Sequence, residues 1–242
     1  MPSVARIPAI NRLLDALPKK TNQRIQRECE MVELSFGDVL CEVGAPIRDV
    51  YFPTQSFISL MATGGGDARL EVALIGNEGM LGVPLVLGLD RSPIRALVHG
   101  AGGAWRMQAA RFRKTVASVP LLKLELDRYV YTRLNQVVQT AVCTGFHDIE
   151  ARLARWLLTA QDRVQGDRLH LTHVLLAELL GVRRSGITTA AGALQRKQLI
   201  HYSRGGITIL DRLGLEQAAC DCYRIANQAA PAAAAVVAAA TA

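Results

Sequence analysis

The stretch Thr172-His173-Val174-Leu175-Leu176-Ala177-Glu178-Leu179-Leu180-Gly181-Val182-Arg183-Arg184-Ser185-Gly186-Ile187-Thr188-Thr189-Ala190-Ala191-Gly192-Ala193-Leu194-Gln195-Arg196 decides the fold of the C-terminal part of the chain. Its leucines recur at helical spacing after Thr172, a good N-cap residue, and Gly181 is expected to end this first helix. A second helix is predicted to begin near Arg183. Its buried face should consist of Ile187, Ala190, Ala191 and Leu194. The two helices form the pattern of a helix-turn-helix.

A short alternating segment follows the second helix. Ile207 and Ile209 should face one way and Thr208 and Leu210 the other, and Arg204-Gly205-Gly206 suits a tight hairpin turn. A helix pair with a β wing and several arginines predicts a nucleic-acid-binding module. Two alternatives remain: an ordinary helical hairpin with solvated arginines, and a winged helix that contacts only proteins.

The charge distribution supports a polyanionic partner. The 242 residues are half hydrophobic, which allows two compact domains, and carry a net charge of +7. Residues 166–212 alone hold seven basic and three acidic side chains. The positive charge is therefore concentrated around the predicted helix-turn-helix, where a polyanionic partner would bind.

The chain carries no pattern typical of export or of a membrane span. Arg6, Pro8 and Arg12 interrupt the first residues, and no segment reaches about 20 uninterrupted apolar residues. Five cysteines without C-x-x-C spacing predict reduced thiols, so we expect a cytoplasmic protein. Cys220 and Cys222 are two apart on an expected helix and should point in different directions, so no metal site is predicted.

The N-terminal half has the sequence pattern of an all-β domain. After helical spacing between Ile10 and Glu28, short apolar runs alternate with Gly, Pro, Asp or Asn, which predicts a β sandwich or roll. Gly64-Gly65-Gly66-Asp67 is expected to be a hairpin loop. The predicted strands are Val32–Phe36, Val39–Val43, Val50–Phe52, Phe57–Met61, Leu70–Ile75, Ile94–Val98 and Ala104–Met107.

A long helix is predicted to open at Pro120. Its apolar residues recur every seven positions with a second set between them, as in the seam of a coiled coil. We interpret this stripe as a homodimer seam; the alternative is a helix packed only on its own β domain. The seam residues are Leu124, Tyr131, Leu134, Val138 and Ala141.

Two further helices should flank the helix-turn-helix. In the first, residues 149–164, Leu153, Trp156 and Leu157 should face the core while the arginines at 152, 155 and 163 face solvent. The second should run from Leu213 to Ala226. The fold class is α+β, and the predicted divisions are 10–117 for the β-roll, 118–146 for the dimerisation helix, 147–228 for the winged helix and 229–242 for a disordered Ala-rich tail.

This order of elements resembles the Crp/Fnr family of bacterial transcription regulators, from about Leu13 to Ala226. The resemblance is carried by Leu176-Ala177-Glu178-Leu179-Leu180-Gly181-Val182 with Arg184, by Leu199-Ile200, and by the wing Ser203-Arg204-Gly205-Gly206-Ile207-Thr208-Ile209-Leu210-Asp211. It implies a cyclic-nucleotide-binding-like β-roll and a non-enzymatic, homodimeric regulator that binds double-stranded DNA. RNA polymerase is the further partner that it implies.

The resemblance also assigns roles around the second helix. Arg184, Ser185 and Thr189 occupy the family's base-reading positions, where the usual residues are Arg, Glu and Arg, and Thr188 lies on the same polar side. Only Arg184 matches, so the DNA site should differ from the familiar one. Contacts to the DNA backbone are expected from Thr172, His173, Arg183, Lys197 and Arg204.

The family's effector chemistry is not matched. Its phosphate cassette pairs Gly-Glu with a later Arg-Ser or Arg-Thr; here Gly82-Val83 and Arg91-Ser92 fall at these places, without the carboxylate. We therefore expect a degenerate effector pocket and no cofactor. Cys29 and Cys41 cannot supply the four thiolates of an Fe–S cluster, and His99 is the only histidine near the roll that could ligate haem.

Two other functions remain as alternatives. One is a regulator gated by a cyclic nucleotide, and the other is a sensor subunit that acts through protein contacts without salt-dependent DNA binding. An enzyme is not expected because the sequence shows no catalytic triad, metal-ligand cluster or pair of carboxylates in a glycine-rich cleft.

Overall fold

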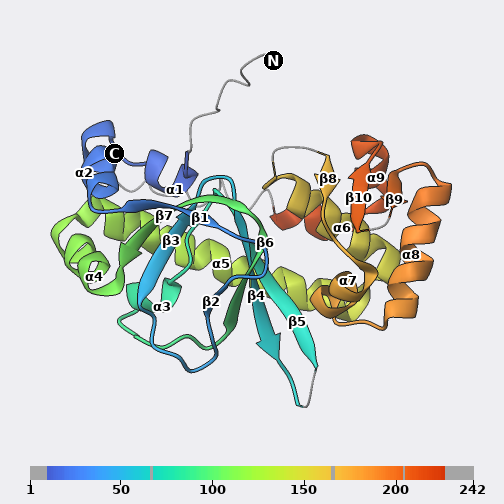
Figure 1. Ribbon diagram of the computed structural model, residues 1–242, viewed down its shortest axis with the longest axis horizontal. Helices are drawn as coiled ribbons and strands as arrows, with labels where there is room; N and C mark the ends of the chain where they lie inside the picture. The colour runs from blue at the N-terminus through green and yellow to red at the C-terminus, as the bar shows by residue number, and fades with distance from the viewer. Residues whose placement is uncertain (1–9, 66–67, 165–166, 204, 227–242) are drawn as a thin grey trace.

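The computed structural model describes residues 10–65, 68–164, 167–203 and 205–226. A β-rich N-terminal domain and a helical C-terminal domain lie side by side, and one long helix runs behind the first toward the second (Figure 1). The predicted order of β domain, long helix and helix-turn-helix is confirmed. Arg204 and the tail 229–242 lie outside the described residues.

Two antiparallel sheets form the N-terminal domain, with strand orders β1-β7-β3 and β2-β6-β4-β5. All seven apolar runs form strands, because each run is bounded by turn-forming residues. The short helices α1 (Arg12–Asp15) and α2 (Lys19–Arg27) come before them. The strands are β1 (Glu30–Leu34), β2 (Val39–Cys41), β3 (Asp49–Pro53), β4 (Phe57–Thr63), β5 (Arg69–Ile75), β6 (Arg95–Gly100) and β7 (Gly102–Gln108).

Two helices of this domain were not predicted from the sequence. The short helix α3 (Val83–Val86) follows Gly82 in a segment that reads as a turn, and α4 (Ala109–Ser118) continues directly from β7 without a glycine or proline between them. The ring of Phe112 in α4 lies 6.4 Å from that of Phe52 in β3. Helix α4 therefore closes one side of the roll's core.

The long helix α5 (Pro120–Phe146) has two different faces. It begins with proline, whose missing N–H is tolerated in the first turn. Leu122, Leu126 and Tyr129 are buried against the roll, and the Tyr129 hydroxyl donates to the carbonyl of Met80 at 3.1 Å. The residues predicted as a dimer seam lie on the other face and are exposed.

The C-terminal domain is a helix-turn-helix with a three-stranded wing, in strand order β8-β10-β9. Thr172 caps the first helix as predicted, accepting from the N–H of Leu175 at 3.2 Å, and Gly181 ends it with φ +63°. The predicted burial of Ile187 is confirmed, and Ile207 and Ile209 share one buried face of the wing while Leu210 is exposed. The elements are α6 (Ile149–Gln161), β8 (Arg168–Leu169), α7 (His173–Leu180), α8 (Arg184–Arg196), β9 (Ile200–Ser203), β10 (Gly206–Ile209) and α9 (Arg212–Ala218).

Two predictions for this domain are wrong. The arginines of α6 do not face solvent: Arg152 is buried, and Arg155 and Arg163 line the junction with the β-roll. The closing helix is also broken, because α9 ends at Ala218 and Ala219 is extended before a short helical run at 222–226.

The break after α9 changes the position of its cysteines. With Ala219 extended, Cys220 and Cys222 do not lie on one helix, and both approach the end of α5. The expectation that they point in different directions is therefore wrong. In the part of the chain that the structure describes, no helix combines the length and hydropathy that a membrane crossing needs.

The two domains meet where α7 and α6 pack against β5 (Figure 1). A Cβ atom on Gly181 would lie 3.0 Å from Cδ1 of Leu70 in β5. Gly181 therefore satisfies two constraints, because it provides the left-handed turn between α7 and α8 and permits close approach of the β-roll.

The substitution Gly181→Ala should lower the free energy of unfolding by about 1–2 kcal/mol, because a side chain in the left-handed region is strained. Denaturant unfolding of the full chain measures this change. Gly192→Ala in the middle of α8 is the matched control and should stabilise by about 0.5–1 kcal/mol, because its helical backbone gains from alanine. Equal effects of both substitutions would contradict the assigned role of Gly181.

Candidate nucleic-acid interface

The solvent face of α8 carries the predicted base-reading side chains. Arg184, Ser185, Thr188 and Thr189 are all exposed, and they come from the first two turns of the helix. The hydroxyl groups of Thr188 and Thr189 donate to carbonyls one turn earlier in the helix, each at 3.1 Å. The four side chains therefore form one continuous, short and polar surface with a single positive charge.

The opposite face of α8 holds this surface in place. Ile187, Ala190, Ala191 and Leu194 are buried in the core of the domain, as predicted. The N–H of Val182 donates to the carbonyl of Ala177 at 2.9 Å, which closes the turn between α7 and α8. The polar face is consequently presented by a rigid pair of helices, as direct readout in a DNA groove requires.

The residues predicted to contact the DNA backbone differ in how free their side chains are to reach a phosphate. The exposed Arg183 is the N-cap of α8, and the hydroxyl oxygen of Thr172 accepts its capping bond from Leu175 while the hydroxyl hydrogen can still be donated to a phosphate. Lys197 donates to Glu150 at 2.6 Å from an exposed position. Of the set, Arg204 lies outside the described residues, and Arg183 has the most direct access to a phosphate.

His173 contributes to the packing between α7 and the wing. Its ring stacks on Tyr202 with centroids 4.1 Å apart, and Nδ1 lies 3.1 Å from the hydroxyl of Thr188. Burial, and secondarily the charge of Arg184, lowers the pKa of His173. The neutral ring therefore predominates at neutral pH and orients Thr188 rather than adding positive charge.

Comparison with known proteins decides the type of this domain. The family model of the Crp-like helix-turn-helix domain matches residues 151–218, the segment from early α6 to the end of α9. This segment is similar to the helix-turn-helix of Crp-like proteins. The match covers the helix-turn-helix and its wing, and leaves the β-roll and the long helix α5 outside it.

Solved structures share the Crp/Fnr fold over most of the chain. A transcriptional regulator assigned to the family from Eubacterium rectale aligns with TM-score 0.63 and 16% identity, over 85% of this chain and 96% of that one. The c-di-GMP-responsive regulator CLP of Xanthomonas campestris gives 0.64 and 18%, over 79% and 99%. FixK2 of Bradyrhizobium japonicum aligns with TM-score 0.66 and 12% identity, over 79% of this chain and 98% of that one. At these identities the likeness concerns the fold; no curated protein matches the sequence.

The residues predicted for the effector pocket make contacts within the β-roll. A Cβ atom on Gly82 would lie 2.6 Å from Cγ1 of Val50. The guanidinium of Arg91 donates to the carbonyl of Gly44 at 2.6 Å, and the buried Ser92 hydroxyl donates to the carbonyl of Ile94 at 2.7 Å. Among the described residues, no hydrogen bond joins Gly82 or Val83 to Arg91 or Ser92.

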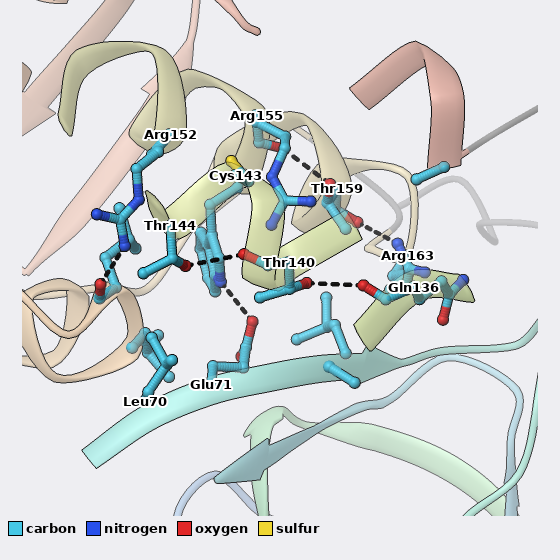
Figure 2. Close-up of a pocket in the computed structure, with 16 residues that line it drawn as sticks. Leu70, Glu71, Gln136, Thr140, Cys143, Thr144, Arg152, Arg155, Thr159 and Arg163 are labelled. Atoms are coloured by element: carbon cyan, nitrogen blue, oxygen red, sulfur yellow. Dashed lines mark hydrogen bonds between the residues drawn. The ribbon is translucent and has the colours of Figure 1, made fainter. Parts of the chain in front are cut away.

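A small cavity of about 70 Å³ lies between β5, α5 and the helices of the DNA-binding domain (Figure 2). The lining is strongly charged, with Glu71 on one side and Arg152, Arg155 and Arg163 on the other. The indole N–H of Trp156 donates to Glu71 Oε1 at 2.7 Å. Polar groups of the two domains therefore meet inside the junction rather than at its rim.

Glu71 is buried without a full set of partners. Its Oε2 accepts no hydrogen bond from any described residue. Burial raises the pKa of Glu71 to about 7, although the Ser59 hydroxyl, the Trp156 indole and the charge of Arg155 favour the ionised form. Ser59 also lies 2.8 Å from Nδ1 of His99, whose pKa is lowered to about 4, mainly by burial. His99 is thus a buried structural residue of the roll.

A second carboxylate in the same junction is ionised. Glu78, in the turn after β5, receives hydrogen bonds at 3.0 and 2.8 Å from Arg163, which lies in the turn after α6. Burial is the largest single influence and would raise the pKa of Glu78, but the charges of Arg163 and Arg133 and the hydrogen bonds from backbone N–H groups together hold that pKa below its usual value. This pair attaches the end of α6 to the roll.

Sequence reasoning missed the residues of this junction. Glu71 and Trp156, like Glu78 and Arg163, are 85 positions apart. No local pattern marks such pairs. The one signal in the sequence was the row of arginines at 152, 155 and 163. Such a row is equally consistent with a face exposed to solvent and with a face packed against carboxylates.

Replacement of Glu71 by Gln should change the pH dependence of stability. Between pH 4.5 and about 7 the unfolded chain has lost this proton while the folded chain keeps it, so stability falls as pH rises. Within this window Glu71 should lower the free energy of unfolding by roughly 1.4 kcal/mol for each unit of pH increase. His99 contributes the opposite sign between about pH 4 and 6.5, so the test is the difference between wild type and Glu71→Gln in unfolding experiments across pH.

The glutamine variant should gain stability over wild type as pH rises through this window and keep the gain above pH 7. Trp156→Phe removes the donor that favours ionised Glu71, and the slope should then extend above pH 7. Parallel pH profiles of wild type and Glu71→Gln would contradict the raised pKa.

Proposed function

We propose that this chain is a sequence-specific transcription regulator that binds DNA as a homodimer and whose β-roll works without a bound cyclic nucleotide. The observation that supports it best is the exposed face of α8, where four predicted base-reading residues lie together on a buried helix-turn-helix core. An α-helix of this kind fits the major groove, where base pairs have distinct hydrogen-bonding patterns.

The free face of α5 supports the homodimer. The exposed fractions of its seam residues are 41% for Leu124, 59% for Tyr131 and Leu134, and 53% for Val138. The alternative, packing on the chain's own roll, accounts for Leu122 and the other residues of the opposite face but leaves this stripe in water. A second copy of α5 would cover it about a two-fold axis, and a two-fold dimer reads two half-sites.

On this proposal the contacts to DNA divide into two classes. Arg184 has the geometry for a bidentate contact with guanine, and Ser185, Thr188 and Thr189 complete the base-reading face. Phosphate contacts come from Arg183, Thr172 and the wing, and fix the register of the protein on the duplex.

The effector positions support a roll without cyclic nucleotide. Val83 offers no carboxylate for a ribose, the Arg91 guanidinium is held by Gly44, and the Ser92 hydroxyl is held by Ile94. These residues do not fit a cyclic phosphate, and we propose that the roll is a structural or protein-contacting platform. RNA polymerase is the partner proposed for it by family resemblance, in a regulatory and non-catalytic role.

Binding of the purified full chain to its own promoter region tests the function. Gel shifts in rising salt should show specific binding that weakens steeply, because phosphate contacts release counterions. Addition of cyclic AMP should leave the shift unchanged. A shift that requires cyclic AMP would overturn the proposed effector-free roll, and salt-independent or absent binding would favour a sensor that acts through protein contacts.

The variant Arg184→Ala should weaken binding to the specific site by about 1–3 kcal/mol and relax specificity at one base pair in each half-site. Competition shifts with substituted sites measure both effects. The exposed Arg113 of α4, replaced by Ala, is the control for loss of one positive charge and should leave affinity unchanged. Equal losses on specific and scrambled DNA would refute the base-reading role.

Leu134→Glu should weaken dimerisation by roughly tenfold or more, because two-fold symmetry brings the new carboxylates close together in an apolar seam. Sedimentation velocity over a range of concentrations gives the dissociation constant. Leu89→Glu is the matched control, since Leu89 is 60% exposed but lies on the roll. A dimer that tolerates Leu134→Glu would place the interface elsewhere.

A further inference from the structure

Four potential metal ligands converge at the junction of α5 with the C-terminal segment. They are Cys143 and His147 at the end of α5, and Cys220 and Cys222 after α9. One ligand atom from each lies within 4.8 Å of all the others. The cluster brings together side chains more than 70 positions apart, so its assembly depends on the fold and on no local motif.

The spacing of these ligand atoms agrees with tetrahedral coordination. Zinc binds thiolate sulfur at about 2.3 Å and imidazole nitrogen at about 2.0–2.1 Å, so tetrahedral ligands are separated by roughly 3.8 Å for S···S and 3.5 Å for S···N. The Sγ atoms of Cys143 and Cys220 are 3.5 Å apart, and Sγ of Cys222 is 3.5 Å from Nδ1 of His147. Little movement would be needed to place an ion among them.

The backbone explains why these side chains converge. Cys143 and His147 are four residues apart, one helical turn, and the N–H of His147 still donates to the carbonyl of Cys143 at 3.2 Å. After α9 the chain is extended at Ala219, and the next helical run begins at Cys222. Because of this break, Cys220 and Cys222 both lie next to Cys143 and His147.

The surroundings also suit a metal–thiolate site. Cys143, Cys220 and Cys222 are buried while His147 is half-buried, which leaves one side for an ion to enter. The side-chain amide of Gln139 donates to Sγ of Cys222 at 2.9 Å, an orienting contact typical of a metal's outer shell. The three thiolates and Zn²⁺ carry a net charge of −1, and the guanidinium groups of Arg152 and Arg155 act electrostatically on Cys143.

We propose that Cys143, His147, Cys220 and Cys222 form a structural site for a divalent, thiophilic metal ion of the zinc class. Three thiols and a neutral imidazole bind the ion, and three protons are released to solvent. Three cysteines and one histidine fill all four positions, so the site holds chain segments together and leaves no open position for catalysis.

The location gives this site a structural consequence. It joins the last turn of α5 to the segment after α9, and Arg152 beside it donates to the carbonyl of Leu180 at the end of α7. A bound ion would therefore fix the end of the proposed dimerisation helix relative to the helix-turn-helix. The proposal itself rests only on the four ligands and stands or fails independently of DNA binding.

Metal analysis of the full chain, purified under reducing conditions without added chelator, tests the proposal. We expect about one zinc per chain, and after removal of zinc and addition of Co²⁺ the thiolate charge-transfer and intense d–d absorption of a tetrahedral cobalt site. Cys29→Ser and Cys41→Ser remove thiols outside the cluster and should leave stoichiometry and spectrum unchanged.

Cys222→Ser and Cys143→Ser should each reduce the thiolate charge-transfer band and the zinc retained. Gln139→Ala keeps all four ligands and should lower metal affinity by about 10–100-fold, which shows the effect without disturbing the buried cysteines. If the cysteine variants do not fold, the metal affinity of Gln139→Ala still tests the proposal.

Three results would overturn the proposal. The first is wild-type protein that retains no zinc and develops no cobalt–thiolate absorption. The second is Cys143→Ser and Cys222→Ser proteins whose cobalt spectra equal that of wild type. The third is a Cys143–Cys220 disulfide in protein whose free thiols were alkylated during cell lysis, which would mark the cluster as a redox pair.

Discussion

The hydrogen bonding of charged side chains at the junction of the two domains is the constraint on which the rest of the structure depends. An ionised side chain removed from water is costly unless a charged or hydrogen-bonding partner meets it. Arg163 reaches Glu78, Trp156 reaches Glu71, and Arg133 of α5 donates to the carbonyl of Leu74 at 2.8 Å. The position of α6 against the roll is thereby specified, and with it the position of the helix-turn-helix.

These contacts are specific because misplacement would leave charges unpaired. Apolar packing alone tolerates small shifts between surfaces, whereas two guanidinium N–H groups that donate to one carboxylate oxygen, as Arg163 does to Glu78, do not. The junction still contains unsatisfied atoms, among them Glu71 Oε2, Arg133 Nη2 and Arg155 Nε. It is therefore polar and incompletely satisfied, a combination suited to an interface whose equilibrium a signal can shift.

Local sequence signals predicted most of the helices and strands. Most of what they missed depends on contacts between residues far apart in the sequence. The seven strands and the caps at Thr172 and Gly181 follow from residues close in sequence, as does the buried face of α8. Helix α4 was missed because no breaking residue separates it from β7. The arginines of α6 were predicted to face solvent because nothing nearby in sequence reveals Glu78, and the cysteines were predicted to diverge because the break at Ala219 carries no glycine or proline.

The short side chains of α8 have a consequence for the kind of DNA sequence that such a surface can distinguish. Thr188 and Thr189 use their hydroxyl hydrogens within the helix, so they can offer an approaching base pair a methyl group and an acceptor oxygen but no hydrogen-bond donor. Methyl groups pack well against the C5-methyl of thymine, and side chains without a free donor offer nothing to the acceptor edge of guanine. On the proposed interface, discrimination along this part of the helix would come from van der Waals contact with thymine, and the helix axis would have to lie deep in the groove.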